Sequence, residues 1–439
     1  MEMKKMYLFL SLLAIIIILY KILLISKTRN KNLPPSPPSI PIWGHLHLLK
    51  PPFHKTFLTL SERYGPIFSL RLGCQPLLVV SSQSAVEECL NKNDIVFSDR
   101  PKFIVGEVLG YNFSILLWSS YGDHWRNLRR VEVLTMFSFR KLNEASPTRK
   151  VEIHNMILEL LTESEGGTRK VNLNNIFNKV AHNFVMRAVN GKPWDNMDFP
   201  SPSYMTTCDF FPILRESIKR GSSCNDEVVT KNLIEQLLDL QEAEPDCYTD
   251  NFIKSFILMQ LVSGSETTIK TLKWAMSNLI NNPKIIAKAR AEIDLIVGYE
   301  RFVDEFDIPK LNYVRWIMYE TLRLTPPAPL LFSHCSSKDC TIGGFQPERF
   351  AYEIEGYNYK FLPFGIGRRS CPASAFATRN ITLALATLIQ CFDWEAPRDG
   401  LVDLTLDSGA SIGPKEKPLE AICHLRASIV NIVAQLKAN

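Results

Sequence analysis

The sequence lacks several features that would assign it to a common class at once. Its formal net charge is only +5, from 50 Lys plus Arg against 45 Asp plus Glu. So small an excess gives no support for a nucleic-acid partner. The 10 cysteines show no repeated spacing, and the closest pair, Cys335 and Cys340, does not have a zinc-knuckle spacing. Reduced, buried or functional thiols are therefore expected in place of a disulfide framework, which suggests a cytosol-facing protein.

A cleavage site is also missing after the apolar N-terminal run, Met6 to Ile25, which only Ser11 and Lys21 interrupt. At about 1.5 Å per residue, a helix of roughly 20 residues spans the hydrocarbon core of a bilayer. Without a small-residue cleavage site, an uncleaved anchor is favoured over a removed signal peptide, with a buried core helix as the other alternative. Residues 1–26 are therefore predicted to be a transmembrane signal anchor.

The residues that flank this run set the expected orientation. Basic residues are more numerous after the run (Lys27, Arg29 and Lys31) than before it (Lys4 and Lys5). Positive charge favours the cytosolic side, so the rest of the chain is expected to face the cytosol. Five prolines between Pro34 and Pro41 then predict a stiff spacer. Residues 27–50 are interpreted as a basic, Pro-rich linker.

Helical periodicity dominates the remaining chain, and strand signals are few. Two short strand-like runs, Ile67–Leu72 and Leu77–Val80, are separated by Gly73 and Pro76. The predicted helices are Ser84–Asn91, Trp125–Leu134, Lys150–Thr162, Val171–Val189, Lys231–Leu240, Asn251–Asn281 and Leu311–Leu324. No internal repeat is visible. The fold class is therefore mainly α with a small β part, as a single large helical domain over residues 51–439.

One cysteine stands apart, in the segment FLPFGIGRRSCPASAFA (Phe361–Ala377). Gly365 and Gly367 permit a sharp turn, and the run after Pro372 is helical. Cys371 is therefore expected at a helix N-terminus, where the dipole favours a thiolate. With no nearby histidine to act as a base, a soft metal ligand is favoured over a nucleophile. A thiolate that ligates haem iron donates electron density and favours O–O cleavage.

This segment resembles the haem-binding loop of cytochrome P-450 monooxygenases, in which Phe, Gly, Arg and Cys recur at fixed spacing. The matching positions are Phe364, Gly367, Arg369 and Cys371, and the last glycine of the pattern is replaced by Ala373. The resemblance implies the cytochrome P-450 fold, with haem b (iron protoporphyrin IX) as cofactor and Cys371 as the iron ligand. A structural buried cysteine in a glycine loop is the alternative.

Two further motifs are similar to the family's propionate-binding positions. In WRNLR, Trp125 and Arg129 share one helix face, where an indole N–H and a guanidinium suit carboxylate recognition. His334 follows APLLFS, at a position where family members place a His or Arg toward the other propionate. On its own, this histidine is also compatible with an ordinary surface position.

The sequence ETLR places Glu320 and Arg323 three residues apart on one helix face. Such a pair is usually solvated and contributes little to stability. In the family, however, an arginine from a downstream PERF joins the pair, and PERF occurs here with Arg349. The resemblance therefore implies a buried Glu320–Arg323–Arg349 network.

The distal side of the expected haem site is LVSGSETTIK (Leu261–Lys270). Gly264 in mid-helix is unfavourable by about 1 kcal/mol relative to alanine, and a flat cofactor pressed against the helix would explain it. Thr267 can donate a hydrogen bond to the Ser263 carbonyl and open the helix. In the family such an acid–alcohol pair, here Glu266 and Thr267, relays protons during dioxygen activation. A plain core helix with a packing glycine is the alternative.

Within the family, the chain resembles the plant endoplasmic-reticulum type and its isoflavone-hydroxylase-like branch, through FSDRP, YGDHWRNLRR, YTDNFIKSFIL, CTIGGF and KEKPLEAIC. The resemblance implies a haem-thiolate monooxygenase that uses dioxygen and NADPH-derived electrons from NADPH–cytochrome P-450 reductase. The implied substrate is a small hydrophobic or phenolic plant metabolite. A single-pass location in the endoplasmic reticulum membrane is also implied, and Arg130 and Arg368 are candidates for a basic reductase-facing surface.

Two stretches, residues 191–248 and 345–347, are shorter than the family pattern predicts. Family members carry two pocket-roofing helices in the first and a β-hairpin with a short helix in the second. The alternative function is therefore a truncated, catalytically impaired paralogue or splice form that retains the haem-binding motifs. A third possibility, a haem-thiolate isomerase or dehydratase, is disfavoured because Glu266 and Thr267 are retained.

Overall fold

The computed structural model describes residues 6–7, 9, 11–18, 33–108, 110–193, 231–338, 340, 361–397, 400–404 and 418–438. The chain divides into two compact units. The first unit consists of Met1–Asp94, Asp339–Phe361 and Ser408–Ser411, and the second of Ile95–Lys338, Leu362–Asp407 and Ile412–Asn439. The first two strands pair with each other in a two-stranded sheet, and Leu72 at the end of the first strand also forms a bridge with Gly44.

The first unit contains the predicted β-hairpin. Strand β1 (Ile67–Leu72) pairs antiparallel with β2 (Gln75–Val80), so both predicted strands are confirmed. The second strand begins two residues earlier than expected, and Pro76 therefore lies inside it, opposite Arg71. Proline is tolerated there because both strands of a two-stranded sheet are edge strands. The other elements are η1 (Leu46–Leu48), α2 (Phe53–Tyr64), α3 (Gln83–Glu87) and the π-helical turn η2 (Glu88–Lys92).

Part of the predicted linker is bonded to this hairpin. The Ser69 N–H donates to the Pro35 carbonyl at 2.8 Å. The Arg71 N–H donates to His45 Nδ1 at 2.7 Å, which leaves the proton on Nε2, and Nε2 donates to the Pro37 carbonyl at 2.8 Å. The Pro-rich stretch therefore belongs to the first unit, in contrast to the separate spacer expected from its composition.

The predicted membrane span is only partly described. Residues 6, 7, 9 and 11–18 are helical, and the rest of the stretch from 6 to 25 lies outside the described residues. Among the residues that the structure describes, no helix has the length and apolar character needed to cross a bilayer.

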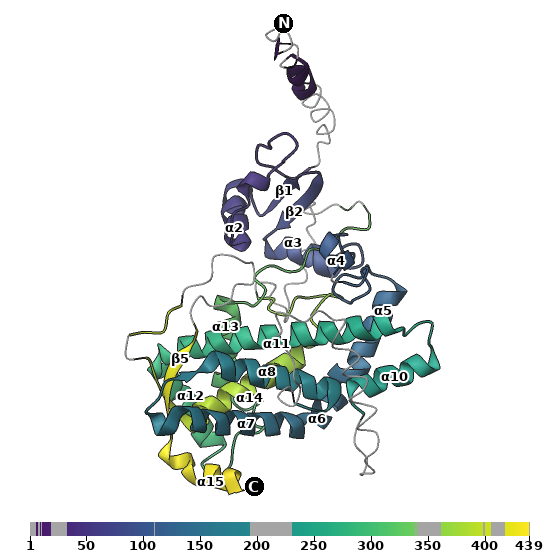
Figure 1. Cartoon of the computed structure of the whole chain (residues 1–439). Helices are drawn as coiled ribbons and strands as arrows, with labels where there is room; N and C mark the ends of the chain where they lie inside the picture. Colours follow the sequence, from purple (N-terminus) through teal and green to yellow (C-terminus); the bar gives the residue numbers. More distant parts are fainter. Residues whose placement is uncertain are drawn as a thin grey trace. The chain divides into compact units, whose positions relative to one another are not determined.

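The second unit is mainly helical, as predicted (Figure 1). Its elements are α4 (Ile104–Val108), α5 (Asp123–Glu132), the π-helical turn η3 (Val133–Phe137), α6 (Phe139–Glu144), α7 (Ser146–Ser164), η4 (Glu165–Gly167), β3 (Val171–Asn172), α8 (Leu173–Asn190), α10 (Leu233–Ala243), α11 (Asp250–Ile280), α12 (Pro283–Ile296), α13 (Asn312–Leu324), α14 (Ser374–Cys391), β4 (Phe392–Glu395), β5 (Glu420–Leu425), η8 (Ala427–Ile429) and α15 (Val430–Ala438). The three strands form one antiparallel sheet in the order β3-β5-β4.

The long helix α11 organises the core of this unit. It begins at a Thr249 cap, whose hydroxyl accepts from the Phe252 N–H at 3.3 Å. The helix packs against α8 along much of its length and also against α13 and α14 (Figure 1). Residues on its buried faces, such as Leu272 and Ala275, have no exposed surface. This packing gives the sequence motifs on α11 a rigid support.

The position of Gly264 corrects one explanation drawn from the sequence. A Cβ atom added at Gly264 would lie 2.9 Å from Cγ2 of Val185, on α8. A contact under 3.0 Å requires a neighbouring atom to move. The glycine is therefore explained by close packing of two helices, which was the alternative reading, and a cofactor is not needed to account for it.

Candidate functional site

The loop around Cys371 has the tight geometry that its glycines predict. Gly365 and Gly367 both have φ of +69°, in the region that favours glycine. The Cys371 N–H donates to the Phe364 carbonyl at 2.8 Å and closes the loop. Helix α14 begins at Ser374, so Cys371 directly precedes its first turn, as expected.

The sequence leads us to expect that the helix dipole lowers the pKa of Cys371, but the structure gives a shift in the opposite direction. Burial raises the pKa of this thiol. The Ala373 N–H and the charge of Arg129 oppose that rise, whereas Glu132 adds to it. Burial outweighs the other effects, so the thiolate needs a further cation to be stable at neutral pH. A bound iron ion is a cation of the required kind, because metals deprotonate the thiols that coordinate them.

Arg369 joins the Cys371 loop to carbonyl groups of residues 98–119. Its Nε donates to the Ser98 carbonyl at 2.8 Å, its Nη1 to Leu116 at 3.1 Å and its Nη2 to Ser119 at 2.6 Å. The guanidinium also lies 4.8 Å from the centre of the Trp125 ring. This stacking and hydrogen bonding fix the indole against the Cys371 loop.

Trp125 and Arg129 extend from α5 toward the same loop. Arg129 Nη1 donates to the Ser370 carbonyl at 2.7 Å. Trp125 is 5% exposed, and its Nε1 is buried with no hydrogen-bond partner among the described residues. Buried donors are rarely left without an acceptor, so this N–H fits a ligand that brings one. A haem propionate is such an acceptor, and these residues therefore fit the cofactor.

His334 lies on a segment held by a residue that the sequence interpretation missed. His334 Nδ1 is 2.7 Å from the Phe97 carbonyl oxygen. Arg100 Nη1 donates to the neighbouring Phe332 and Ser333 carbonyls, at 3.0 and 2.8 Å. Burial lowers the pKa of Arg100 to about 10. The motif FSDRP contains this arginine, but nothing in its spacing predicts a partner more than 200 residues away.

On α11, the predicted bond within the helix is confirmed. Thr267 Oγ1 donates to the Ser263 carbonyl at 2.7 Å. Ser263, Glu266 and Thr267 are exposed, and Val262 is 52% exposed, whereas much of the helix is buried. The acid and the alcohol therefore lie on one open face of the helix, which suits contact with a ligand.

Glu266 has several cationic neighbours. Burial lowers the pKa values of Lys270, Lys273 and His182, and the negative charge of Glu266 opposes this effect in each case. His182 extends from α8, where its Nδ1 lies 2.6 Å from the Asn178 carbonyl. The carboxylate of Glu266 therefore lies among groups that can hold or exchange protons.

The Glu320–Arg323 pair forms, but the structure does not bury it. Arg323 Nε and Nη2 each donate to a Glu320 carboxylate oxygen at 2.7 Å. The side chains are 55% and 58% exposed, so the expected burial is wrong for these two residues. Arg349, the third member of the predicted network, lies outside the described residues.

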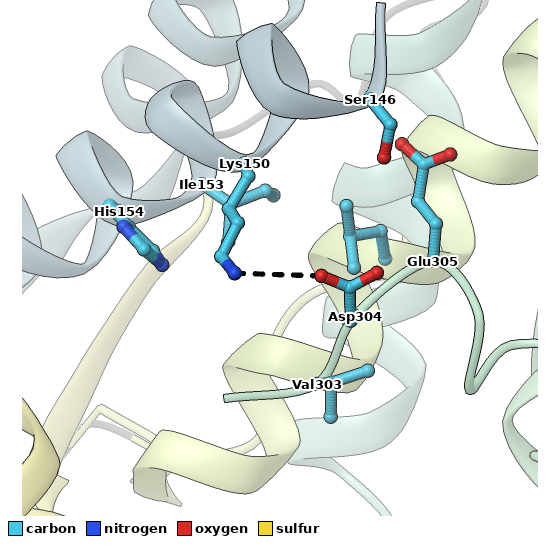
Figure 2. A pocket seen from close by; sticks show the side chains of 8 residues that line it. Ser146, Lys150, Ile153, His154, Val303, Asp304 and Glu305 are labelled. Carbon is cyan, nitrogen blue, oxygen red and sulfur yellow. Dashed lines mark ion pairs between the residues drawn. The ribbon is translucent and has the colours of Figure 1, made fainter. Parts of the chain in front are cut away.

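A small hollow elsewhere in the unit contains none of the predicted site residues (Figure 2). It lies between α7 and the segment that leads to Glu305, and its lining residues are Ser146, Lys150, Ile153, His154, Val303, Asp304, Glu305 and Leu383. Lys150 Nζ is 3.6 Å from Asp304 Oδ2 across the hollow. Glu305 also pairs with the buried Arg149, so this region joins α7 to its neighbours.

Comparisons with known proteins identify the family of this chain. The family model for cytochrome P450 matches residues 34–210, 208–346 and 344–421. A protein of Catharanthus roseus, "Cytochrome P450 81Q32", is 37% identical over 472 residues that cover 93% of this chain and 94% of the relative. The isoflavone 2'-hydroxylase of Glycyrrhiza echinata is 36% identical, with 94% and 96% covered. The isoflavone 3'-hydroxylase of Medicago truncatula is 38% identical, with 93% and 95% covered.

These findings agree on one assignment. The matched residues include the Cys371 loop, α5 and α11, which carry the candidate site. The family implies a haem iron, a redox partner and a small-molecule substrate. The chain is therefore a cytochrome P450 monooxygenase, and it belongs to the branch of the cytochrome P450 family that contains the plant isoflavone hydroxylases.

Proposed function

We propose that this chain uses dioxygen and NADPH-derived electrons to hydroxylate a small hydrophobic or phenolic plant metabolite. The unpartnered indole N–H of Trp125, beside Arg129 and the Cys371 loop, carries the proposal. It supports a carboxylate-bearing cofactor next to a thiol. Haem bound there supplies the iron chemistry that activates dioxygen.

The residues of the proximal side hold the cofactor. Cys371 is the proposed iron ligand, and the Ala373 N–H bonds to its sulfur, which favours the charged form. Trp125 Nε1 and the guanidinium of Arg129 bind a propionate, and His334 is the proposed contact for the other. Arg369 keeps the indole in place through its stacking contact at 4.8 Å.

The residues of α11 handle protons. The Thr267 hydroxyl, which donates to the Ser263 carbonyl at 2.7 Å, can accept a hydrogen bond from a water molecule on the open face of the helix. Glu266 is the proposed proton source, and Lys270 and Lys273 lie near its carboxylate. Glu266 and Thr267 would therefore hold and pass protons on the open face of α11 when haem is bound.

The names of two relatives indicate the substrate class. Both relatives are named as isoflavone hydroxylases and cover nearly the whole chain, which supports an aromatic, isoflavone-like substrate. The test is to incubate the haem-loaded full chain with NADPH, NADPH–cytochrome P-450 reductase and a panel of isoflavones. We expect a product heavier by one oxygen, detected by mass spectrometry. Haem-loaded chain that oxidises NADPH without any hydroxylated product from the panel would contradict this substrate class.

The proposed partners are the reductase and a membrane. Arg130 and Arg368 are exposed, and their positive charges suit an acidic partner surface. The apolar run in residues 1–26 supports an anchor in the endoplasmic reticulum membrane, with the catalytic part on the cytosolic side. Retention in the membrane fraction after alkaline carbonate washing is the expected result.

A second candidate function is a catalytically impaired, shortened form. The three family-model matches adjoin at residues 208–210 and 344–346, within or next to the two stretches that the sequence identifies as short. The alignments with two relatives span 472 and 481 residues, whereas the chain has 439. Both observations support missing segments. Product formation in the assay above separates the active form from the impaired one.

A further inference from the structure

Glu132 is a buried carboxyl group with no role in the proposed mechanism. It is the last residue of α5 and is 2% exposed. Its Oε1 accepts a hydrogen bond of 2.9 Å from Nε2 of Gln260, which extends from α11 and is 7% exposed. Its Oε2 is buried and has no hydrogen-bond partner among the described residues. This pair directly joins α5 to α11.

The position of Glu132 on α5 relates it to the candidate haem site. It lies seven residues after Trp125 and three after Arg129, which places all three on one side of the helix. The charge of Arg129 acts on Glu132, and the charges of both act on the Cys371 sulfur. The π-helical turn Val133–Phe137 follows immediately and ends the regular helix at this residue.

Helix cohesion alone does not explain this pair. Burying a carboxyl group whose second oxygen has no partner is unfavourable. Two apolar side chains of similar size would hold the helices together without this penalty. A directional hydrogen bond differs from apolar packing in that it fixes the distance between its two atoms. The retained polar pair therefore points to a requirement for a fixed spacing between α5 and α11.

We propose that Glu132 and Gln260 form a strut that sets the spacing between the haem-propionate helix α5 and the proton-relay helix α11. Glu132 is a positioning residue in this account, because it acts through Trp125 and Arg129. The inference rests on the proposed function, since the spacing matters only if a haem binds beside α5 and α11.

The test compares variants of the full-length, haem-loaded chain by the rate of haem transfer to excess apomyoglobin and by thermal unfolding. In Glu132→Leu/Gln260→Leu, both polar partners are replaced, so the fold keeps its packing and loses the strut. We expect about tenfold faster haem transfer, which corresponds to the loss of one hydrogen bond, without lower thermal stability. Glu132→Gln retains an acceptor for Gln260 and should restore transfer to within about twofold of the unaltered chain.

Gln390→Leu serves as the matched comparison, because it removes the hydrogen bonds of a buried side-chain amide, of similar length, outside the site. Gln390 Oε1 accepts from the Val303 N–H at 2.9 Å, and Nε2 donates to the Arg301 carbonyl at 3.0 Å. This variant should unfold at lower temperature with unchanged haem transfer. Equal transfer rates in the double variant and the unaltered chain would overturn the strut and leave the proposed function intact. An unaltered chain that holds no thiolate-ligated haem would overturn both.

Discussion

At the scale of single residues, the unpartnered indole N–H gives a direct test of cofactor binding. In Trp125→Phe a smaller aromatic ring replaces the indole, and the Nε1 donor is lost. A hydrogen bond to a charged acceptor contributes about 1.5–3 kcal/mol, so haem should dissociate roughly ten- to a hundredfold faster. Trp394→Phe is a suitable comparison, since Trp394 is buried and its Nε1 donates to the Leu388 carbonyl at 2.9 Å. That variant should lose stability and keep its haem, and equal haem loss in both variants would argue against a propionate contact.

The proton relay makes a separate residue-scale prediction. In Thr267→Ala we expect unchanged haem content and NADPH oxidation that yields hydrogen peroxide in place of product, because the hydroxyl no longer directs a proton. Thr271→Ala removes a comparable hydroxyl, which donates to the Thr267 carbonyl at 2.9 Å and is 1% exposed. In Thr271→Ala, the fraction of NADPH oxidation that yields product should stay unchanged. If this fraction is equally high in Thr267→Ala, the proposed proton relay is contradicted.

Residue-scale reasoning from the sequence succeeded where the chemistry is local. The turn at Gly365 and Gly367 and the Thr267 bond to the preceding turn depend on neighbours within a few residues, so spacing predicts them. The partners of Arg369 and Arg100 could not be predicted in the same way. Each guanidinium binds carbonyls that lie more than 200 residues away from it in the sequence, and only the folded chain brings them within reach.

At the scale of elements, the packing of α8 on α11 is tested at Gly264. In Gly264→Ala the new Cβ would lie 2.9 Å from the stiff, β-branched Val185. Overpacking of this kind lowers the free energy of unfolding by about 1–3 kcal/mol, which exceeds the gain of roughly 1 kcal/mol in helix propensity. We therefore expect a net loss of stability, measured by urea unfolding.

The Val185→Ala background reverses the sign of that prediction. With the clashing methyl groups removed, Gly264→Ala should be neutral or stabilising by up to about 1 kcal/mol. If the substitution destabilises both backgrounds equally, the contact with Val185 does not explain the glycine.

Element boundaries show what periodicity can and cannot specify. The hydrophobic pattern predicted α11 to within one residue at each end. The same reasoning extended the helix from Trp125 to Leu134, whereas the structure ends α5 at Glu132 and continues as a π-helical turn. Side-chain periodicity does not distinguish these two backbone forms. The turn depends on tertiary contacts around Glu132 and Thr135, both of which are buried.

At the scale of the whole molecule, the buried Glu132 makes global stability depend on pH. Burial raises the pKa of Glu132 from 4.5 to about 7. The folded chain therefore binds this proton more tightly than the unfolded chain, and stability falls as pH rises from about 4.5 to 7. Glu132→Gln has no such proton, so it should be more stable above this window by on the order of 3 kcal/mol, and the difference should vanish below it.

Urea unfolding on both sides of the window measures this difference. Glu320→Gln provides a comparison in which stability should depend on pH in the opposite direction, because hydrogen bonds from Arg323 lower the pKa of Glu320. The ionised Glu320 carboxylate makes a small stabilising contribution above its unfolded pKa, and this contribution is lost in acid. A Glu132→Gln difference that does not change with pH would show that this carboxyl group keeps the same pKa on unfolding.

The family assignment is the part of the whole-molecule account that the sequence predicted most fully. Motifs along most of the globular part predicted it, and the comparisons confirm it. The pairing of the strands in the two sheets was not predicted. Composition does not specify that pairing.

The most direct test of the central claim is the spectrum of the reduced, full-length chain under carbon monoxide. A thiolate ligand to haem iron gives a strongly red-shifted Soret band. We expect this band in the unaltered chain and in Cys391→Ala, which alters a buried cysteine at the far end of α14. We expect it to disappear in Cys371→Ala. A band that persists in Cys371→Ala, or that is missing from the haem-loaded unaltered chain, would contradict the assignment of Cys371 as the iron ligand.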